Sequence, residues 1–329
     1  MHLSRPFLLV LAAAALPASA QDARFRDSPP RGAPGAARGP SLPAPLPPLL
    51  GDCDAAALAM KSAAEREATA DYWRKIAACL NDAGCEFTAF EPVARAELER
   101  ALLDAETQFQ ARLAVCAELG QGPYDPVLDP SEFSPVVDNP LLPFPPRRTL
   151  IYEKRTDQGL ETVEVTAGKE VVDVAGFPCR AVRVVEKLDG VKVEETLDWY
   201  SQRTDGAVWY FGELAKHYVD GFLDNLDGSW RTGRDGAKPG IVMLADPRPG
   251  DVYRQEFSIS SAEDLARVLA TGETVTVPYG TFTNCVKIEE WSPLSPENAE
   301  WKYYSPTFGM VLEVDSVTGE RLELVRVRW

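Results

Sequence analysis

The feature that most constrains the fold is a pattern that occurs twice in the C-terminal half of the chain. Each copy has a glycine, a nearby cysteine, an alternating apolar run, two adjacent aromatic residues followed by serine, and a second glycine. The copies are Gly176, Cys179, Trp199-Tyr200-Ser201 and Gly206, and then Gly280, Cys285, Tyr303-Tyr304-Ser305 and Gly309. Two related antiparallel β units, each with an aromatic strand that enters a tight turn, would produce this pattern. We therefore expect a duplicated antiparallel β domain.

The sequence around the two copies supports a β domain over residues 149–329. Polar and apolar residues alternate along it, and Asp-Gly pairs separate the alternating runs, as hairpin turns do. The pairs are Asp189-Gly190, Asp205-Gly206, Asp220-Gly221, Asp227-Gly228 and Asp235-Gly236. One helix is expected within the meander, over residues 261–270, with Ser260 and Glu263 as its capping box.

Three segments outside this domain have a composition of their own. Residues 1–20 combine a basic start, a short apolar run and the small residues Ala18-Ser19-Ala20, which is the pattern of a secretory signal peptide. Residues 21–50 are rich in Pro, Ala, Gly and Arg, which predicts a disordered linker. Residues 121–148 are rich in Pro and Asp, so we expect an extended connector that lies along the β domain.

Residues 51–120 show helical periodicity and contain four of the six cysteines. The apolar spacing predicts one helix to about Leu80 and a second from about Pro92, which suits a first helical turn. An antiparallel hairpin places Cys53 opposite Cys116 and Cys79 beside Cys85, so we expect disulfides 53–116 and 79–85. A redox or metal site is disfavoured, because the hairpin has no Cys-x-x-Cys and no histidine.

The other two cysteines, Cys179 and Cys285, hold matching places in the two copies of the pattern. Export to an oxidising compartment favours a bond between them. Equivalent positions in neighbouring units need not lie within the Cα distance that a disulfide requires, however. A disulfide and two buried thiols both stay open, with the disulfide slightly favoured.

The chain after residue 20 has a single histidine, His217, which excludes multi-histidine metal sites. No Gly-x-Ser-x-Gly motif accompanies it, and we expect His217 to be a partly exposed strand residue. The turns around Asp224, Asp227 and Asp235 do not have EF-hand spacing and are expected to be hairpin turns, with another kind of calcium site as the alternative. We expect no metal and no cofactor.

Charge and hydropathy limit the compartment and the partners. The net charge of −16 repels nucleic acid and anionic membrane surfaces. No segment after the predicted signal peptide has the about 18 consecutive apolar residues of a transmembrane helix. We expect a soluble protein of the periplasm or the extracellular space, with a small molecule or an envelope component as its partner.

Two places carry candidate ligand-binding residues. On one strand pair, aromatic rings lie near Glu195, Asp198 and Glu213, and rings beside carboxylates are typical of a carbohydrate or small-ligand platform, although rings at this spacing also form cores. The second place is the set of charged Gly/Pro loops over residues 228–250, because loops on a rigid sheet often bind ligands. The candidates are Trp199, Trp209, Glu213, Trp230, Arg234, Asp235 and Arg254. No catalytic residue is identified.

Several segments of residues 100–329 have a distinctive sequence. They are QFQARLAVCAELGQGPYDPVLDP, DNPLLPFPPRRTLIYE, DWYSQRTDGAVWYFGE, GSWRTGRDGAKPGI, VPYGTFTNCVKIEEWSPL and WKYYSPTFGMVLE. In these segments the chain resembles a group of secreted bacterial proteins of uncharacterised function. The pattern of that group has Pro-Gly-Thr-Thr where this chain has Pro146-Arg147-Arg148-Thr149, a difference confined to one turn. The resemblance implies the domain layout and no activity.

The predicted fold class is α+β. A disulfide-stapled helical hairpin precedes a duplicated antiparallel β domain, either a strongly curved sheet or a partly open barrel with one short helix. The predicted function is non-enzymatic binding or interaction with the cell envelope. The alternatives are a periplasmic carrier of an apolar ligand and a glycan hydrolase that uses carboxylates.

Overall fold

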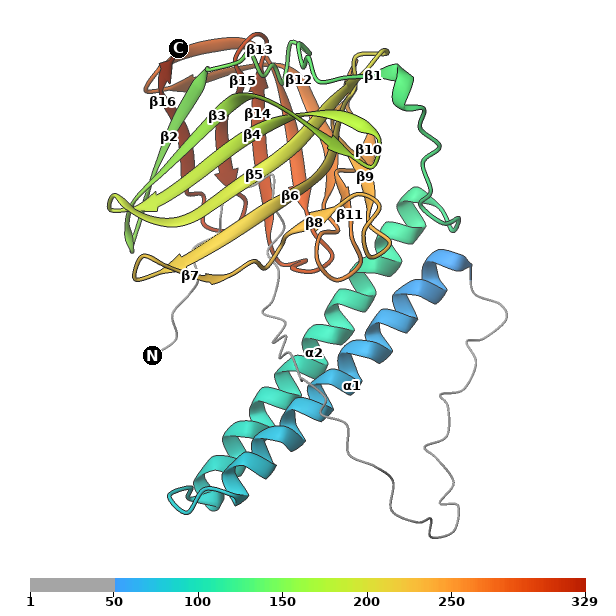
Figure 1. Cartoon of the computed structure of the whole chain (residues 1–329), viewed down its shortest axis with the longest axis vertical. Helices are drawn as coiled ribbons and strands as arrows, with labels where there is room; N and C mark the ends of the chain where they lie inside the picture. Colours follow the sequence, from blue (N-terminus) through green and yellow to red (C-terminus); the bar gives the residue numbers. More distant parts are fainter. Residues whose placement is uncertain (1–50) are drawn as a thin grey trace.

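The computed structural model describes residues 51–329, which form a helical hairpin and a curved β-sheet (Figure 1). The predicted signal peptide and linker, residues 1–50, lie outside the described residues. The hairpin consists of α1 (Asp52–Leu80) and α2 (Phe87–Leu119). It extends away from one end of the sheet, with its tip farthest from the strands.

Two disulfides hold the ends of the hairpin together. Cys53 is bonded to Cys116 at the base, where the Cα atoms lie 5.7 Å apart, and Cys79 is bonded to Cys85 at the tip. The structure thus has both of the pairings predicted from the sequence. Disulfides persist in oxidising compartments, so the folded protein is extracytoplasmic.

The second helix begins earlier than we predicted. It begins at Phe87 and contains Pro92, whereas the sequence suggested that Pro92 stands in its first turn. The backbone N–H groups of Ala89 and Phe90 donate to the carbonyl of Glu86, which closes an additional first turn. Pro92 is the sixth residue of α2, beyond the first four N–H groups that need no partner within the helix, so the helix continues through a position that donates no backbone hydrogen bond.

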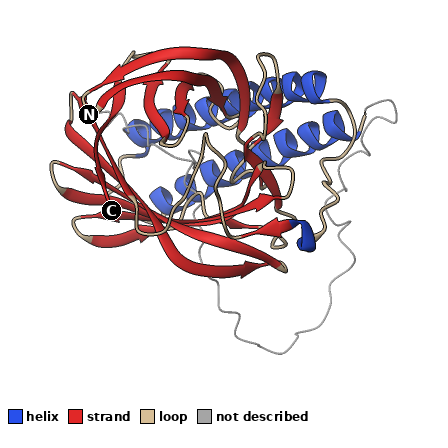
Figure 2. Ribbon diagram, turned by 90° about the horizontal axis from the view of Figure 1, so that it is seen from above, coloured by secondary structure: helices blue, strands red, loops and turns tan. Residues whose placement is uncertain are grey.

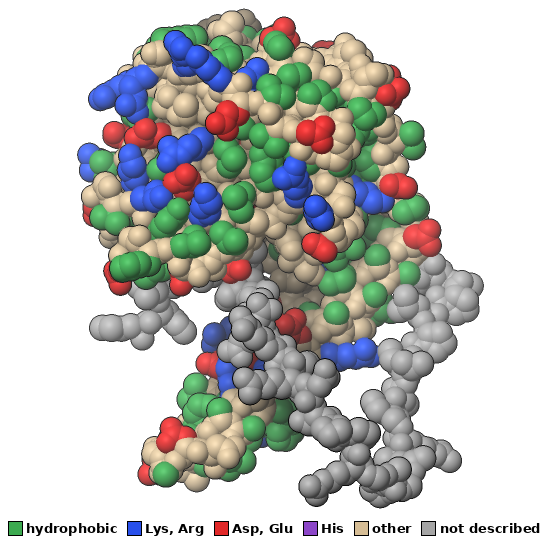
Figure 3. Space-filling model, viewed as in Figure 1, with side chains coloured by type: hydrophobic (Ala, Val, Ile, Leu, Met, Phe, Trp, Pro, Cys, Tyr) green, Lys and Arg blue, Asp and Glu red, His purple; other side chains and the backbone are tan. Residues whose placement is uncertain are grey.

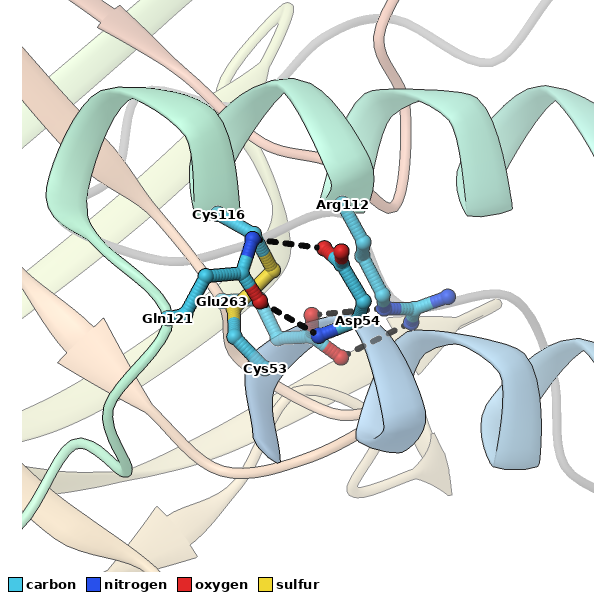
Figure 4. Close-up of a disulfide and its surroundings, with 6 residues drawn as sticks. All are labelled: Cys53, Asp54, Arg112, Cys116, Gln121 and Glu263. Atoms are coloured by element: carbon cyan, nitrogen blue, oxygen red, sulfur yellow. Dashed lines mark hydrogen bonds and ion pairs between the residues drawn. A yellow bond between two sulfur atoms is a disulfide. The ribbon is translucent and has the colours of Figure 1, made fainter. Parts of the chain in front are cut away.

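An ion pair fixes the base of the hairpin to the sheet (Figure 4). Arg112 on α2 donates two hydrogen bonds, each 2.8 Å long, to the carboxylate of Glu263. Both side chains are buried, 10% and 6% exposed. Gln108 on the same helix donates to the backbone carbonyl of Leu294. Contacts between distant parts of the sequence therefore set the direction of the hairpin.

The strands form one antiparallel sheet that curves into a nearly closed barrel (Figure 2). The strand order is β10-β12-β13-β14-β15-β16-β2-β3-β4-β5-β6-β9-β11, with β1 paired to β5 and both β7 and β8 paired to β6. The outermost strands, β10 and β11, are separated along the chain only by Gln255. The two ends of the sheet therefore meet at one position.

The strands have the following bounds: β1 Phe133–Ser134, β2 Thr149–Thr156, β3 Gly159–Val174, β4 Phe177–Leu188, β5 Val191–Arg203, β6 Val208–Val219, β7 Phe222–Asn225, β8 Trp230–Arg231, β9 Lys238–Met243, β10 Val252–Arg254, β11 Glu256–Phe257, β12 Leu265–Val277, β13 Gly280–Trp291, β14 Ala299–Ser305, β15 Gly309–Asp315 and β16 Arg321–Arg328.

The two copies of the sequence pattern form two three-stranded meanders. The first copy is β4-β5-β6 and the second is β13-β14-β15. Tyr200 on β5 and Tyr304 on β14 hold the same place in the pattern, and both lie in the largest apolar core of the barrel. The duplication is therefore structural as well as sequential.

The helix predicted over residues 261–270 is wrong, because β12 begins at Leu265. The backbone N–H of Ser260 does donate to the Glu263 carboxylate, as in a capping box, but the chain then leaves as a strand. Val268 and its neighbours on β12 pair with β13, and this long-range pairing outweighs the local helical preference.

The connector runs along the barrel and supplies part of its core. Phe133 packs edge-on against Phe177 and Phe211 on the outer face of the sheet. Leu142 and Phe144 are buried in the same apolar core as Tyr200. A segment without a helix or long strand is thus held in place by apolar side chains.

Candidate functional site

The interior of the barrel contains a layer of buried acidic side chains. Acidic residues outnumber the lysines in this layer, although buried charges normally need a partner. The buried carboxylates are those of Glu161, Glu186, Glu194, Asp198, Glu213, Glu256, Glu290 and Glu313, and the lysines are Lys154 and Lys302. On the outer face drawn in Figure 3, Lys and Arg lie interspersed with Asp and Glu. The interior layer thus has more acidic than basic side chains.

In the second copy, one lysine lies among three carboxylates. The Lys302 ammonium lies 2.5 Å from Glu290, 3.5 Å from Glu300 and 3.7 Å from Glu313. Burial disfavours the charged lysine, but the three neighbouring carboxylates outweigh this effect and raise the pKa of Lys302. The Tyr304 hydroxyl donates to Glu290. This half of the barrel therefore contains an internal cation, although Oε2 of Glu313 has no hydrogen bond among the described residues and burial raises the pKa values of Glu300 and Glu313.

The first copy has a corresponding set of carboxylates and no such cation. Asp198 on β5 and Glu213 on β6 are direct cross-strand partners, and Glu256 on β11 lies close enough to both to raise the pKa of Glu213. None of the three has an ion-pair partner in the described part of the chain. We call Asp198, Glu213 and Glu256 the acidic cluster.

Most oxygens of the acidic cluster also lack hydrogen bonds. The Tyr210 hydroxyl donates to Oδ1 of Asp198 at 2.9 Å. Among residues 51–329, neither oxygen of Glu213 has a partner, nor do Oδ2 of Asp198 and Oε2 of Glu256. Burial raises the pKa of Asp198 to about 8 and holds the pKa values of Glu213 and Glu256 well above their usual range. Burial therefore favours the protonated form of these carboxyls.

The backbone of β6 builds the cluster through a bulge. Three residues of β5, Asp198 to Tyr200, face four residues of β6, Tyr210 to Glu213. The additional residue lets both Tyr210 and Glu213 point into the barrel. Gly212 within this bulge has φ of 133°, and a Cβ atom there would collide with the backbone of the adjacent strand β8. The glycine thus lets β8 approach.

Aromatic rings line the interior beside the acidic cluster. Phe144 stacks on Tyr200 at 5.0 Å, and Tyr200 stacks on Tyr210 at 4.7 Å between ring centroids. Trp230 meets Tyr210 edge-on at 5.3 Å, and it is the cross-strand partner of Glu213. Faces of such rings attract cations. The site therefore combines carboxylates with an aromatic wall.

The structure places the seven predicted site residues in four different surroundings. Glu213 and Trp230 belong to the interior site. Trp199 and Trp209 pack on the opposite face of the sheet, in the core around Phe133. Arg234 and Asp235 are exposed on a turn, and Arg254 lies over the rings of Tyr124 and Phe257 on the outside.

The candidate residues chosen from the sequence include neither Glu256 nor the tyrosines of the site, Tyr200 and Tyr210. Asp198 stands out in the sequence only as one of several carboxylates near a tryptophan. A usable signal was present: the residue before the aromatic pair is Asp198 in the first copy and Lys302 in the second. The same place in the pattern thus carries opposite charges.

Cys179 and Cys285 are free and buried, in two different apolar clusters, so the disulfide that the compartment favoured is not formed. Burial raises the pKa of both thiols. These residues fill the core as small apolar side chains.

His217 is half-buried on β6 and contacts two acceptors. Its Nδ1 lies 3.0 Å from the Glu194 carboxylate, and its Nε2 lies 2.9 Å from the carbonyl oxygen of Asp227. The bond to Glu194 raises the pKa of His217. Over residues 51–329, no three His, Cys, Asp or Glu side chains are arranged to hold a metal ion, and this includes the turns around Asp224 and Asp235.

A small cavity lies near the connector. Its volume is about 50 Å³, which is room for roughly two water molecules. It is lined mostly by apolar side chains, among them Leu142, Phe144 and Met310, together with Arg148 and Lys302.

The fold and the site define a nearly closed β-barrel with an acidic, aromatic interior and a disulfide-bonded helical hairpin outside it. Neither helix of the described chain is long and apolar enough to cross a membrane. No protein-family model and no curated protein matches the chain significantly. Among solved structures it is similar to a "putative lipoprotein" from Parabacteroides distasonis, with 16% identity and a TM-score of 0.33, over 57% of this chain and 98% of that chain. A likeness this weak supports no conclusion about function.

Proposed function

We propose that this chain is an exported binding protein that holds a small ligand inside the barrel, at the acidic cluster. The observation that carries this proposal is Glu213, which is 1% exposed and whose two carboxylate oxygens have no partner among the described residues. Buried polar groups almost always have a hydrogen-bond partner, and exceptions often mark a functional site.

The energetics favour a site that is completed by a ligand. Leaving a buried polar group unpaired costs about 1–3 kcal/mol, and more if the group is charged. A fold that carries this cost at Asp198, Glu213 and Glu256 gains it back when a ligand supplies the missing partners. The aromatic wall of Tyr200, Tyr210 and Trp230 adds apolar contact area on the same side.

The two alternative functions have less support. A carrier of an apolar chain needs a long cavity, whereas the cavity beside the connector measures about 50 Å³. A glycan hydrolase needs two carboxylates on either side of an open cleft. Asp198 and Glu213 are neighbours on adjacent strands and do not lie on opposite sides of a cleft.

Native mass spectrometry of the full chain, purified from the compartment to which it is exported, tests the proposal. We expect a retained small molecule on the wild-type protein and on Glu164→Gln, a control on the outer face of β3 that pairs with Lys187. We expect its loss from Glu213→Gln. A ligand-free wild-type spectrum, together with no thermal shift from a library of small metabolites, would falsify the proposal. A retained lipid would favour the carrier, and cleavage of an added glycan would favour the hydrolase.

A further inference from the structure

We infer that the ligand of the acidic cluster carries a primary ammonium group. In the first copy, this group would occupy the position that the Lys302 ammonium occupies in the second copy. This inference rests on the proposed function and adds the chemical class of the ligand. Its basis is the internal duplication, because one half of the barrel contains the cation that the other half lacks.

The strand register makes the two halves comparable. Lys302 on β14 is the direct partner of Glu313 on β15, and Asp198 on β5 is the direct partner of Glu213 on β6. Glu313 therefore corresponds to Glu213, and Lys302 corresponds to Asp198. The first copy keeps the acid on the third strand and replaces the lysine by another acid.

The remaining carboxylates show how the first copy differs. Glu290 and Glu300, which also contact Lys302, correspond by register to Val184 and Thr196. In their place, Glu256 reaches the first copy from β11. The first copy thus has three carboxylates around a position at which its own chain supplies no ammonium among the described residues.

Polar groups that are not acidic also point to a ligand at this position. The Tyr200 hydroxyl and Nε1 of Trp230 are buried and lie close to the carboxylates of Asp198 and Glu256, but neither forms a hydrogen bond of good geometry in the described chain. Trp230 is the cross-strand partner of Glu213 and shares its face of the sheet, so its ring edge lies beside the cluster. A ligand with an ammonium and a hydroxyl would satisfy both the acceptors and the donors.

The surroundings favour an ammonium over a metal ion. Metal ions such as Ca²⁺ need six to eight converging oxygens, and the described residues hold no metal-binding arrangement of three or more ligands. An ammonium needs only a few acceptors, because it has three N–H donors.

Binding of a cation must displace protons from the cluster, so the affinity rises with pH. Ionised carboxylates attract an ammonium, whereas protonated ones do not. The titratable groups that act on the cluster are Glu194 and Tyr200 on β5, Tyr210 on β6, Asp264 before β12 and Glu290 on β13. Protons released on binding come from the carboxyls of the cluster itself.

Isothermal titration calorimetry of the full chain, freed of retained ligand, with ethanolamine as the probe tests the inference. Ethylene glycol, which is similar in size and neutral, and CaCl₂ are the comparison probes. We expect binding of ethanolamine alone, an affinity that increases from pH 6 to pH 8, and proton release detected with buffers of different ionisation enthalpy. Glu213→Gln should weaken binding about tenfold or more, as the loss of a charged hydrogen bond does, and Glu164→Gln should not.

A second variant tests the correspondence with Lys302 directly. Asp198→Lys places an ammonium where the second copy has one, so we expect it to melt at a higher temperature than Asp198→Leu and to bind no ethanolamine. Equal binding of ethanolamine and ethylene glycol, binding of Ca²⁺ alone, or no binding of ethanolamine from pH 6 to pH 8 overturns the inference. If a neutral ligand is nevertheless retained by the wild type and lost from Glu213→Gln, the binding function stands and only the ammonium is wrong.

Discussion

Raising the pH from 5 to 7 is expected to destabilise the ligand-free protein. Burial raises the pKa of Asp198 from 3.8 to about 8 and the pKa of Asp264 from 3.8 to about 7. Each carboxyl therefore holds its proton in the folded chain at a pH where the unfolded chain has lost it. The contribution of this difference to the free energy of unfolding is complete below about pH 4. It is lost as the pH rises through the pKa of the group in the folded state.

The size of the effect follows from proton linkage. Between pH 5 and pH 6 both carboxyls are protonated in the folded chain and ionised in the unfolded chain. Each then lowers the free energy of unfolding by about 1.4 kcal/mol per pH unit, so the two together give a slope of about 2.7 kcal/mol per pH unit. The raised pKa values of Glu213, Glu256 and His217 act in the same direction, so this slope is a lower bound. Glu195, whose pKa is lowered to about 2, acts only at lower pH.

Urea unfolding at pH 5, 6 and 7, followed by tryptophan fluorescence at constant ionic strength, measures this slope. Asp198→Asn removes one titrating group and should reduce the slope by about 1.4 kcal/mol per pH unit. The exposed Asp246→Asn should leave it unchanged. A stability that increases from pH 5 to pH 7, or an unchanged slope in Asp198→Asn, would refute the assignment of a protonated interior.

Three further predictions concern the architecture. Arg112→Ala leaves the Glu263 carboxylate buried without its partner and should cost about 3–5 kcal/mol in urea unfolding; a loss below the error of the measurement would show that the hairpin is not anchored there. Gly212→Ala forces β8 away from β6 and should lower the free energy of unfolding by about 1–3 kcal/mol. The fluorescence emission of Trp230 should change as well, and an unchanged spectrum would argue against the close approach of the two strands. Cys179 and Cys285 should resist iodoacetamide in the folded protein and react in denaturant, whereas a 179–285 peptide pair in a non-reducing digest would contradict the two free thiols.

The hairpin and the class of the β domain were predictable because their signals are local or strongly periodic. Two helices of known length fix which cysteines meet, and so the pairs Cys53–Cys116 and Cys79–Cys85 followed from spacing alone. Asp-Gly turns and alternation likewise indicate antiparallel strands. The helix predicted over residues 261–270 was wrong for the opposite reason. From Leu265 onward these residues form β12, and the pairing of β12 with β13 depends on residues far away in the sequence.

The candidate site was only partly predictable for the same reason. Glu213 and Trp230 were identified as aromatic and acidic neighbours, but Trp199 and Trp209 face the other side of the sheet. The bulge at Gly212 determines which residues of β6 point inward, and alternation alone does not show a bulge. Glu256 comes from the strand that closes the barrel, so its position depends on the whole topology.

The bond between Cys53 and Cys116 makes the hairpin a covalent ring whose entrance and exit lie together at the barrel. A protease that cuts at the tip, for example at the exposed Gly84, would release no fragment, because Cys79–Cys85 and Cys53–Cys116 both bridge the cut. Because the tip lies farthest from the strands, a peptide tag or a fluorescent domain inserted there would project away from the barrel. The hairpin tip is therefore the position at which this chain can be labelled or tethered while the barrel interior stays intact.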